Sequence, residues 1–124
     1  MYDGSVLGRV AFWECHGYSH LIPRLMRDRD ERPSAQDARD AREQFSLIVR
    51  LVEPVRILIA SAWAVAVLKQ ASDTGDYKKV GDNDYWEMRF QGLPAVGIHH
   101  PGAWKRVGYD LERARLATAR LRSM

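Results

Sequence analysis

A single proline, Pro54, divides the most strongly patterned part of this chain into a helix and a strand. Proline ends a helix because it lacks a backbone N–H and disfavours helical dihedral angles in the residue before it. The run Val55–Ala60 that follows is apolar apart from Arg56 and lacks alternation, which indicates a central strand buried on both faces of a parallel sheet. Five apolar residues precede Pro54 at three- and four-residue steps: Ala38, Ala41, Phe45, Ile48 and Val52. This spacing predicts one apolar face of a helix.

The predicted helix has a clear beginning after Pro33. Ser34 is a good N-cap residue, and Asp37 lies three residues further on, which is a weak form of the capping box. Downstream of the strand, Ser61 is followed by the apolar stretch 62–68 with no turn residues between them. The strand Val55–Ala60 is therefore expected to pass directly into a second helix.

The remaining elements are assigned by composition. Val6–Trp13 is rich in β-branched and aromatic residues and is predicted to be a strand, followed by a loop at Glu14–His20. The densely charged Arg24–Arg32 is expected to be an exposed connection. Asp73–Asp76 and Gly81–Asp84 carry loop residues. Two further strands, Tyr85–Phe90 and Leu93–His99, are expected to be joined by Gln91-Gly92, and Asp110–Arg122 to be a final helix. The inner face of that helix is predicted at Leu111, Ala114, Thr118 and Leu121.

Strands and helices thus alternate along the chain. This order predicts one α/β domain over residues 1–124, a layered αβα sandwich around a short, mainly parallel sheet. Ligands bind such sheets beyond the carboxyl ends of the strands. Three loops are expected to converge there: those after Trp13, at Ser61 and at His99-His100.

Composition narrows the class of protein. The chain is 46% hydrophobic and 28% charged, which is typical of a globular domain. No apolar run approaches the roughly 20 residues of a membrane span, and the N-terminus lacks the pattern of a signal peptide. Cys15 is the only cysteine, so no intrachain disulfide can form. We therefore expect a cytoplasmic protein with no membrane contact.

Positive charge is concentrated near the C-terminus. The whole chain has a net charge of +3, whereas Trp104–Met124 holds six basic and two acidic residues. Four of the basic residues are candidates for contacts with nucleic-acid phosphates: Lys105, Arg106, Arg113 and Arg120. Trp104 can stack on a base beside them. The simpler interpretation is a solvated helix end, where the helix dipole favours cations.

The segment Gly97-Ile98-His99-His100-Pro101-Gly102 places two imidazoles at the end of a predicted strand and before a stiff turn. Together with the helix–proline–strand unit Leu51–Ala64 and the strand Val10–Cys15, the His100-Pro101-Gly102 turn resembles the uracil-DNA glycosylase superfamily. In that family a histidine beside a proline hydrogen-bonds the flipped base and stabilises its negative charge as the glycosidic bond breaks, and the loop after it enters the minor groove. The resemblance implies that His100 takes the catalytic role and that Pro101 and Gly102 belong to the wedge.

The same resemblance places a base pocket at Trp13, Glu14, Cys15 and Ser61. The chain departs from the family pattern at three points. Met1–Ser5 contains no water-positioning segment, Glu14 or Cys15 stands where the family has a base-reading asparagine, and Gly102 replaces a serine. We therefore expect a binder of single- or double-stranded DNA with a glycosylase-like fold. If it is an enzyme, the reaction is hydrolysis of an N-glycosidic bond.

Other interpretations remain open from the sequence. Cys15, His16, His20, His99 and His100 include residue types that bind zinc, but no established zinc spacing is present. Cys15 with His16 or His20 can pair as nucleophile and base, without an identifiable third group. We expect neither a metal nor a cofactor. A different class of function, a small protein-interaction or homo-oligomeric domain, is suggested by a short sheet and four tryptophans.

Overall fold

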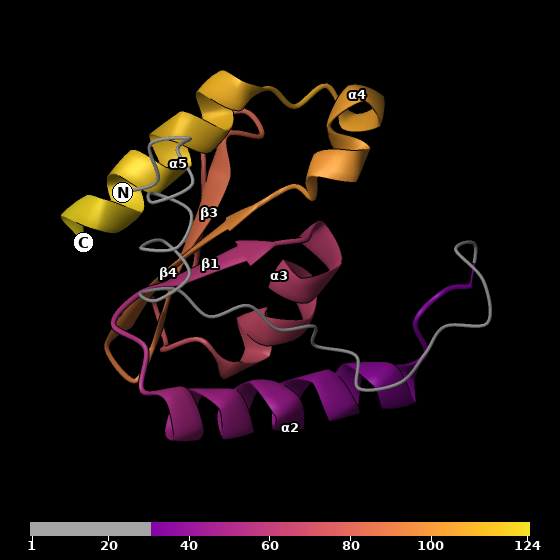
Figure 1. Cartoon of the computed structure of the whole chain (residues 1–124), viewed down its shortest axis with the longest axis vertical. Coiled ribbons are helices and arrows are strands. Elements are labelled where there is room, and N and C mark those ends of the chain that lie inside the picture. The colour runs from indigo at the N-terminus through magenta and orange to yellow at the C-terminus, as the bar shows by residue number, and fades with distance from the viewer. Residues whose placement is uncertain (1–30) are drawn as a thin grey trace, which may run out of the picture.

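The computed structural model describes residues 31–124, in which helices pack on both faces of a four-stranded sheet (Figure 1). The described elements are α2 (Ala35–Val52), β1 (Ile57–Ala60), α3 (Ala62–Leu68), η1 (Lys69–Ala71), β2 (Lys78–Val80), β3 (Tyr85–Phe90), β4 (Leu93–Ile98), η2 (Pro101–Ala103), α4 (Trp104–Val107) and α5 (Leu111–Ser123). The predicted strand Val6–Trp13, the loop Glu14–His20 and most of Arg24–Arg32 lie outside the described residues. Over residues 31–124, no helix is both long enough and apolar enough to cross a membrane.

Helix α2 begins and ends where the sequence predicts. The Ser34 hydroxyl accepts a hydrogen bond from the Asp37 amide at 3.1 Å, and the Ser34 amide donates to the Asp37 carboxylate at 2.7 Å. This reciprocal pair is a complete capping box. At the other end, Glu53 takes a left-handed conformation with φ of 50°, and Pro54 follows it. The chain thereby leaves the helix and turns into β1.

The predicted final helix is also confirmed. Asp110 caps α5, and its carboxylate accepts a hydrogen bond from the Arg113 amide at 3.0 Å. The inner face of α5 includes Ala114 and Leu121 as predicted, but Leu111 is 53% exposed. Val52 of α2 was likewise expected to be buried and is 60% exposed. Both residues lie in the terminal turn of their helix, where a periodic sequence pattern extends further than the surface it packs on.

The order of strands in the sheet is β1-β4-β3-β2. Strands β1 and β4 are parallel, whereas β4–β3 and β3–β2 are antiparallel. The α/β class is confirmed, but the expectation of a mainly parallel sheet is wrong for the described residues. The hairpin of β3 and β4 makes one pairing antiparallel, and the unpredicted strand β2, which is short and gives little sequence signal, adds a second. The central buried strand is β4 rather than the run at Val55–Ala60, since β1 is the last strand at its end of the described sheet.

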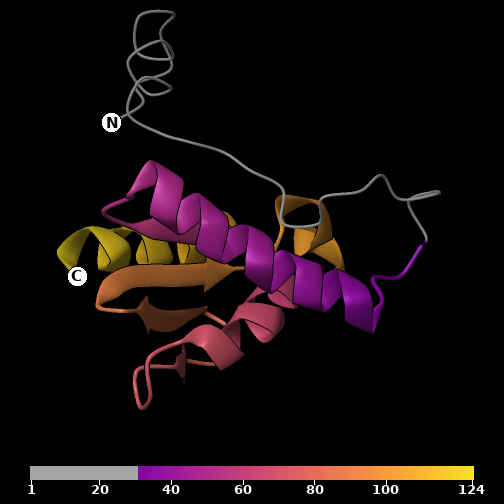
Figure 2. The ribbon, with the colours of Figure 1, turned by 90° about the horizontal axis from the view of Figure 1, so that it is seen from below.

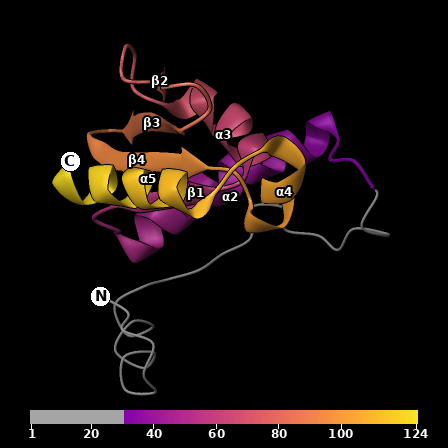
Figure 3. The ribbon, with the colours of Figure 1, turned by 90° about the horizontal axis from the view of Figure 1, so that it is seen from above.

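Each face of the sheet carries its own layer of helices (Figures 2 and 3). Phe45 of α2 and Leu68 of α3 join a buried cluster on one face, with Met88 of β3. Ala117 of α5 joins a second cluster on the opposite face, with Val96 of β4. The alternation of strand side chains between faces builds both clusters from the same strands. The predicted αβα sandwich is therefore present.

A carboxylate holds the turn between β3 and β4. Gln91 and Gly92 both have positive φ, 52° and 82°, which is typical of a tight two-residue hairpin turn. The Asp73 carboxylate accepts hydrogen bonds from the Gln91 amide at 2.7 Å and the Gly92 amide at 2.8 Å. The amide of Asp73 in turn donates to the Arg89 carbonyl at 2.7 Å. The loop after α3 is thus fixed to the hairpin.

Gly97 allows α3 to lie directly on the middle of the sheet. A Cβ atom at this position would be 2.3 Å from Cγ2 of Val65, which is far below van der Waals contact. Val65 is itself 2% exposed and has no room to move away. A glycine is therefore required at this position by close packing.

Substitution of Gly97 by alanine should lower the free energy of unfolding by about 1–3 kcal/mol, because it overpacks the core. Urea denaturation measures this loss. In a Val65→Ala background, which removes the clashing methyl, adding the Gly97→Ala change should cost less. An equal loss in both backgrounds would contradict the assigned contact.

Candidate functional site

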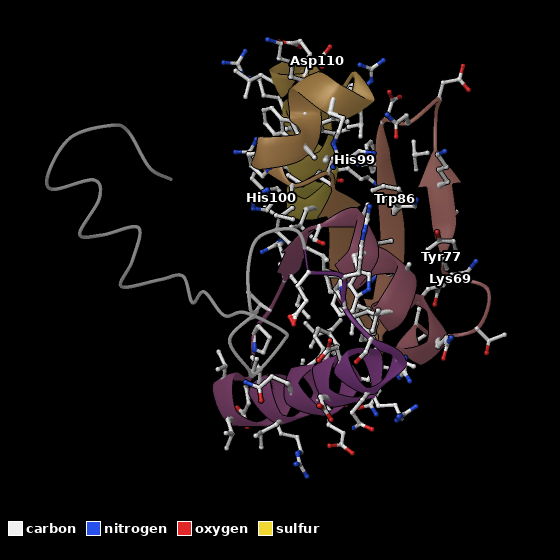
Figure 4. All side chains as sticks on the ribbon, turned by 90° about the vertical axis from the view of Figure 1, so that its right-hand side faces the viewer. Lys69, Tyr77, Trp86, His99, His100 and Asp110 are labelled. Atoms are coloured by element: carbon white, nitrogen blue, oxygen red, sulfur yellow. The ribbon has the colours of Figure 1, made fainter. Side chains whose placement is uncertain are left out.

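Two of the three loops predicted to converge do so at the carboxyl ends of β1 and β4. The parallel register pairs Ala60 with Ile98, the last residues of the two strands, so Ser61 and His99 leave the sheet at the same end. His99 and His100 lie together beyond this end of the strands, close to α4 (Figure 4). The third predicted loop follows Trp13 and lies outside the described residues. The convergence that suggested a binding site is therefore confirmed for Ser61 and the two histidines.

His100 is exposed and caps the short helix η2. Its Nδ1 accepts a hydrogen bond from the Gly102 amide at 3.0 Å. Because Nδ1 is an acceptor, the neutral imidazole carries its proton on Nε2. No hydrogen bond joins Nε2 to another residue in the described part of the chain. The turn at Pro101 and Gly102 therefore presents an oriented N–H donor to solvent.

His99 has a different environment from its neighbour. Its Nε2 lies 2.7 Å from the Asn83 amide oxygen, and its ring lies 5.0 Å from the rings of both Trp86 and Tyr109. Burial lowers the pKa of His99, and the positive charge of Lys79 lowers it further. His99 is thus a neutral, packed residue that stabilises the C-terminal end of β4.

Trp104 attaches α4 to the C-terminal end of β4. Its indole N–H donates to the His99 carbonyl at 2.7 Å, and its ring lies 5.6 Å from that of Tyr109. The Tyr109 hydroxyl donates to the Asp84 carbonyl, and burial raises the pKa of Tyr109 to about 12. Trp104 is half-buried and has this structural task, while its predicted stacking on a base stays untested.

Two of the predicted phosphate contacts are held by acidic side chains of the same chain. Arg113 forms ion pairs with Asp84 and Asp110, each at 3.2 Å. Arg120 is paired with the buried carboxylate of Glu87. Both arginines therefore have structural partners, which makes them weaker candidates for binding phosphate.

Lys105 and Arg106 differ from these arginines. They are neighbours on α4, both exposed, and among the described residues neither forms an ion pair or a hydrogen bond through its side chain. Their helix follows the His100 turn directly in the chain. The imidazole N–H of His100 and these two cations thus belong to one short, exposed segment, which we name the His100–Arg106 surface.

The remaining predicted pocket residues are only partly visible. Ser61 caps α3, and its hydroxyl accepts a hydrogen bond from the Ala64 amide at 3.2 Å. Trp13, Glu14 and Cys15 lie outside the described residues. Within residues 31–124, no group of three His, Cys, Asp or Glu side chains is placed to hold a metal ion. His99 and His100 bind different partners and do not converge.

Glu87 is a charged residue that the sequence did not single out. It is 5% exposed, and its second oxygen lies 3.1 Å from Lys78 Nζ. Burial by itself raises the pKa of Glu87, but the hydrogen bonds and charges of Arg120 and Lys78 outweigh burial, and the pKa falls below its ordinary value. Its only sequence signal is a carboxylate placed within an apolar strand.

Comparison with known proteins adds no identity. No family model, no curated protein and no solved structure matches this chain. The resemblance to uracil-DNA glycosylases is therefore supported by the residues quoted above alone.

Replacement of Glu87 by glutamine should lower the free energy of unfolding at pH 7 by about 1–2 kcal/mol, because the ion pairs are lost. A depressed pKa stabilises the fold above pH 4.5, the ordinary value, and this contribution disappears as the pH falls through the lower folded value. The variant should therefore lose less stability than the parent on acidification. Urea denaturation from pH 3 to pH 7 measures both effects.

Glu112→Gln is the matched control, since that carboxylate is 76% exposed and pairs with an exposed arginine. It should change stability by less than about 0.5 kcal/mol. Equal acid sensitivity in the parent and Glu87→Gln would show that the buried carboxylate makes no such contribution.

Proposed function

We propose that this protein binds nucleic acid through the His100–Arg106 surface. The observation that carries the proposal is the exposure of Lys105 and Arg106 without acidic partners in the described chain, in the same short segment as the exposed imidazole of His100. Unpaired cations bind phosphates by releasing condensed counterions. Arg113 and Arg120, which already have carboxylate partners, contribute less to this binding.

The chemistry of His100 also suits contact with a base. A neutral imidazole with its proton on Nε2 donates to a carbonyl oxygen or to a phosphate oxygen. In base excision the same donor would stabilise the negative charge that develops on the leaving base. This role follows the resemblance to uracil-DNA glycosylases. We place nucleic-acid binding first because no residue that activates water is identified.

Fluorescence anisotropy with single-stranded and duplex oligonucleotides, at low and moderate salt, tests the binding. Lys105→Gln/Arg106→Gln should weaken affinity by at least about tenfold at low salt and reduce the slope of log affinity against log salt by about two. Arg39→Gln/Arg50→Gln is the control with equal charge change. It alters α2, at the other end of the molecule from α4 (Figure 1), and should leave the salt slope nearly unchanged.

Equal losses in both double variants would show that net charge, rather than the His100–Arg106 surface, determines binding. The alternative of a protein-interaction domain predicts no salt-sensitive DNA affinity and a dimer in light scattering. That result would replace the proposal.

Alkaline treatment of uracil-containing samples then tests for base release. We expect any such release to be abolished in His100→Ala, because the donor to the leaving base is lost. Retained cleavage in this variant would remove His100 from the mechanism. Binding without cleavage in the parent would identify a binder that lacks glycosylase activity.

A further inference from the structure

The outer edge of β1 is open in the described part of the structure. No described strand pairs with this edge, while the other edge of β1 pairs with β4. Large apolar side chains are exposed on β1 and where α2 leads into it: Leu51 at 74%, Val52 at 60%, Val55 at 75% and Leu58 at 45%. An unpaired edge is a template for pairing with a further strand, and exposed apolar residues beside it indicate a surface that contacts another segment.

The sequence of β1 agrees with a missing neighbour. Val55–Ala60 is apolar apart from Arg56, as in the strands of sheets that are covered on both faces, yet only Ile59 of the β1 side chains is buried. Among the described residues, β1 therefore has the composition of a central strand and the position of an edge strand.

Chain topology indicates which segment supplies that neighbour. Helices α2 and α3 lie on the same face of the sheet, because both contribute to the cluster around Met88. Connections between parallel strands are right-handed in nearly all proteins, so successive crossovers on one face move across the sheet in one direction. The crossover through α3 leads from β1 to β2, which runs parallel to β1 and lies on the same side of it as β4. A parallel strand that precedes α2 must therefore lie on the opposite side of β1, at the open edge.

We propose that residues 6–13 add to the open edge of β1 as a parallel strand. This segment has the composition of a strand, and it precedes α2 by a long connection. Residues 14–30 can extend over about 55 Å, which exceeds the roughly 30 Å diameter of a domain of this size. Docking would cover Leu58 and the residues around it.

The docking proposal is independent of nucleic-acid binding and is tested by stability. Leu58→Lys should lower the thermal midpoint by several degrees, because its charge would lie beside the apolar side chains of the docked strand. Leu116→Lys is the matched control, since this residue of α5 is 55% exposed and faces away from the buried cluster. It should shift the midpoint by no more than about 2 °C. Equal, small shifts in both variants would overturn the proposal.

Hydrogen exchange of the full chain tests the segment itself. The backbone amides of residues 55–61 that face away from β4 should be protected in the parent and exchange faster in Val10→Pro, because a proline within the added strand removes a backbone donor and disrupts its pairing with β1. Arg29→Pro, outside the proposed strand, should leave this protection unchanged. If the amides of α5 also exchange faster in Val10→Pro, the chain has unfolded globally. The thermal midpoints of Leu58→Lys and Leu116→Lys then decide whether the segment docks.

A second copy of the chain is the competing occupant. Protection of residues 55–61 should be the same from low to high protein concentration if the segment comes from the same chain. Protection that rises with concentration, together with a dimer in light scattering, would overturn the proposal and assign the edge to a second molecule.

Discussion

The pairing of β1 with β4 against α3 determines how the rest of this structure is arranged. Ala95, Val96, Gly97 and Ile98 are all buried, because β4 has strands on both sides and helices on both faces. The pairing leaves room for Val65 only where the strand has no side chain, at Gly97. The resulting register brings Ser61 and His99 to the same end of the sheet. The positions of the candidate site residues that follow β4 depend on this register.

The two adjacent histidines at the end of β4 have separate roles. His99 is neutral, packed between aromatic rings, and tied to Asn83 and Trp104 through its side chain and carbonyl. His100 is exposed and oriented by the amide of Gly102. The rigid residue fixes the end of the strand, so the exposed one has a defined position. This division explains how a short turn can present a single donor in a defined orientation.

Much of the fold could be predicted from local patterns. The capping box at Ser34, the break at Pro54 and the cap at Asp110 depend on residues close in sequence, and the structure confirms them. Strand direction and edge position depend on distant pairing, so the mainly parallel sheet and the central place of Val55–Ala60 were wrong for the described residues. The partners of Arg113 and Arg120 were also hidden, because Asp84 and Glu87 are far from them in sequence.

The hairpin of β3 and β4 has a consequence for the order of folding. Its two strands are separated only by Gln91 and Gly92, and the Asp73 carboxylate holds that turn. The parallel partners Ile57 and Ala95 are separated by α3, β2 and β3, so joining them closes a much longer loop and costs more chain entropy. The hairpin can therefore form early and serve as a template for β1. The pairing of β1 with β4, which brings Ser61 to His99, then forms late in the folding pathway.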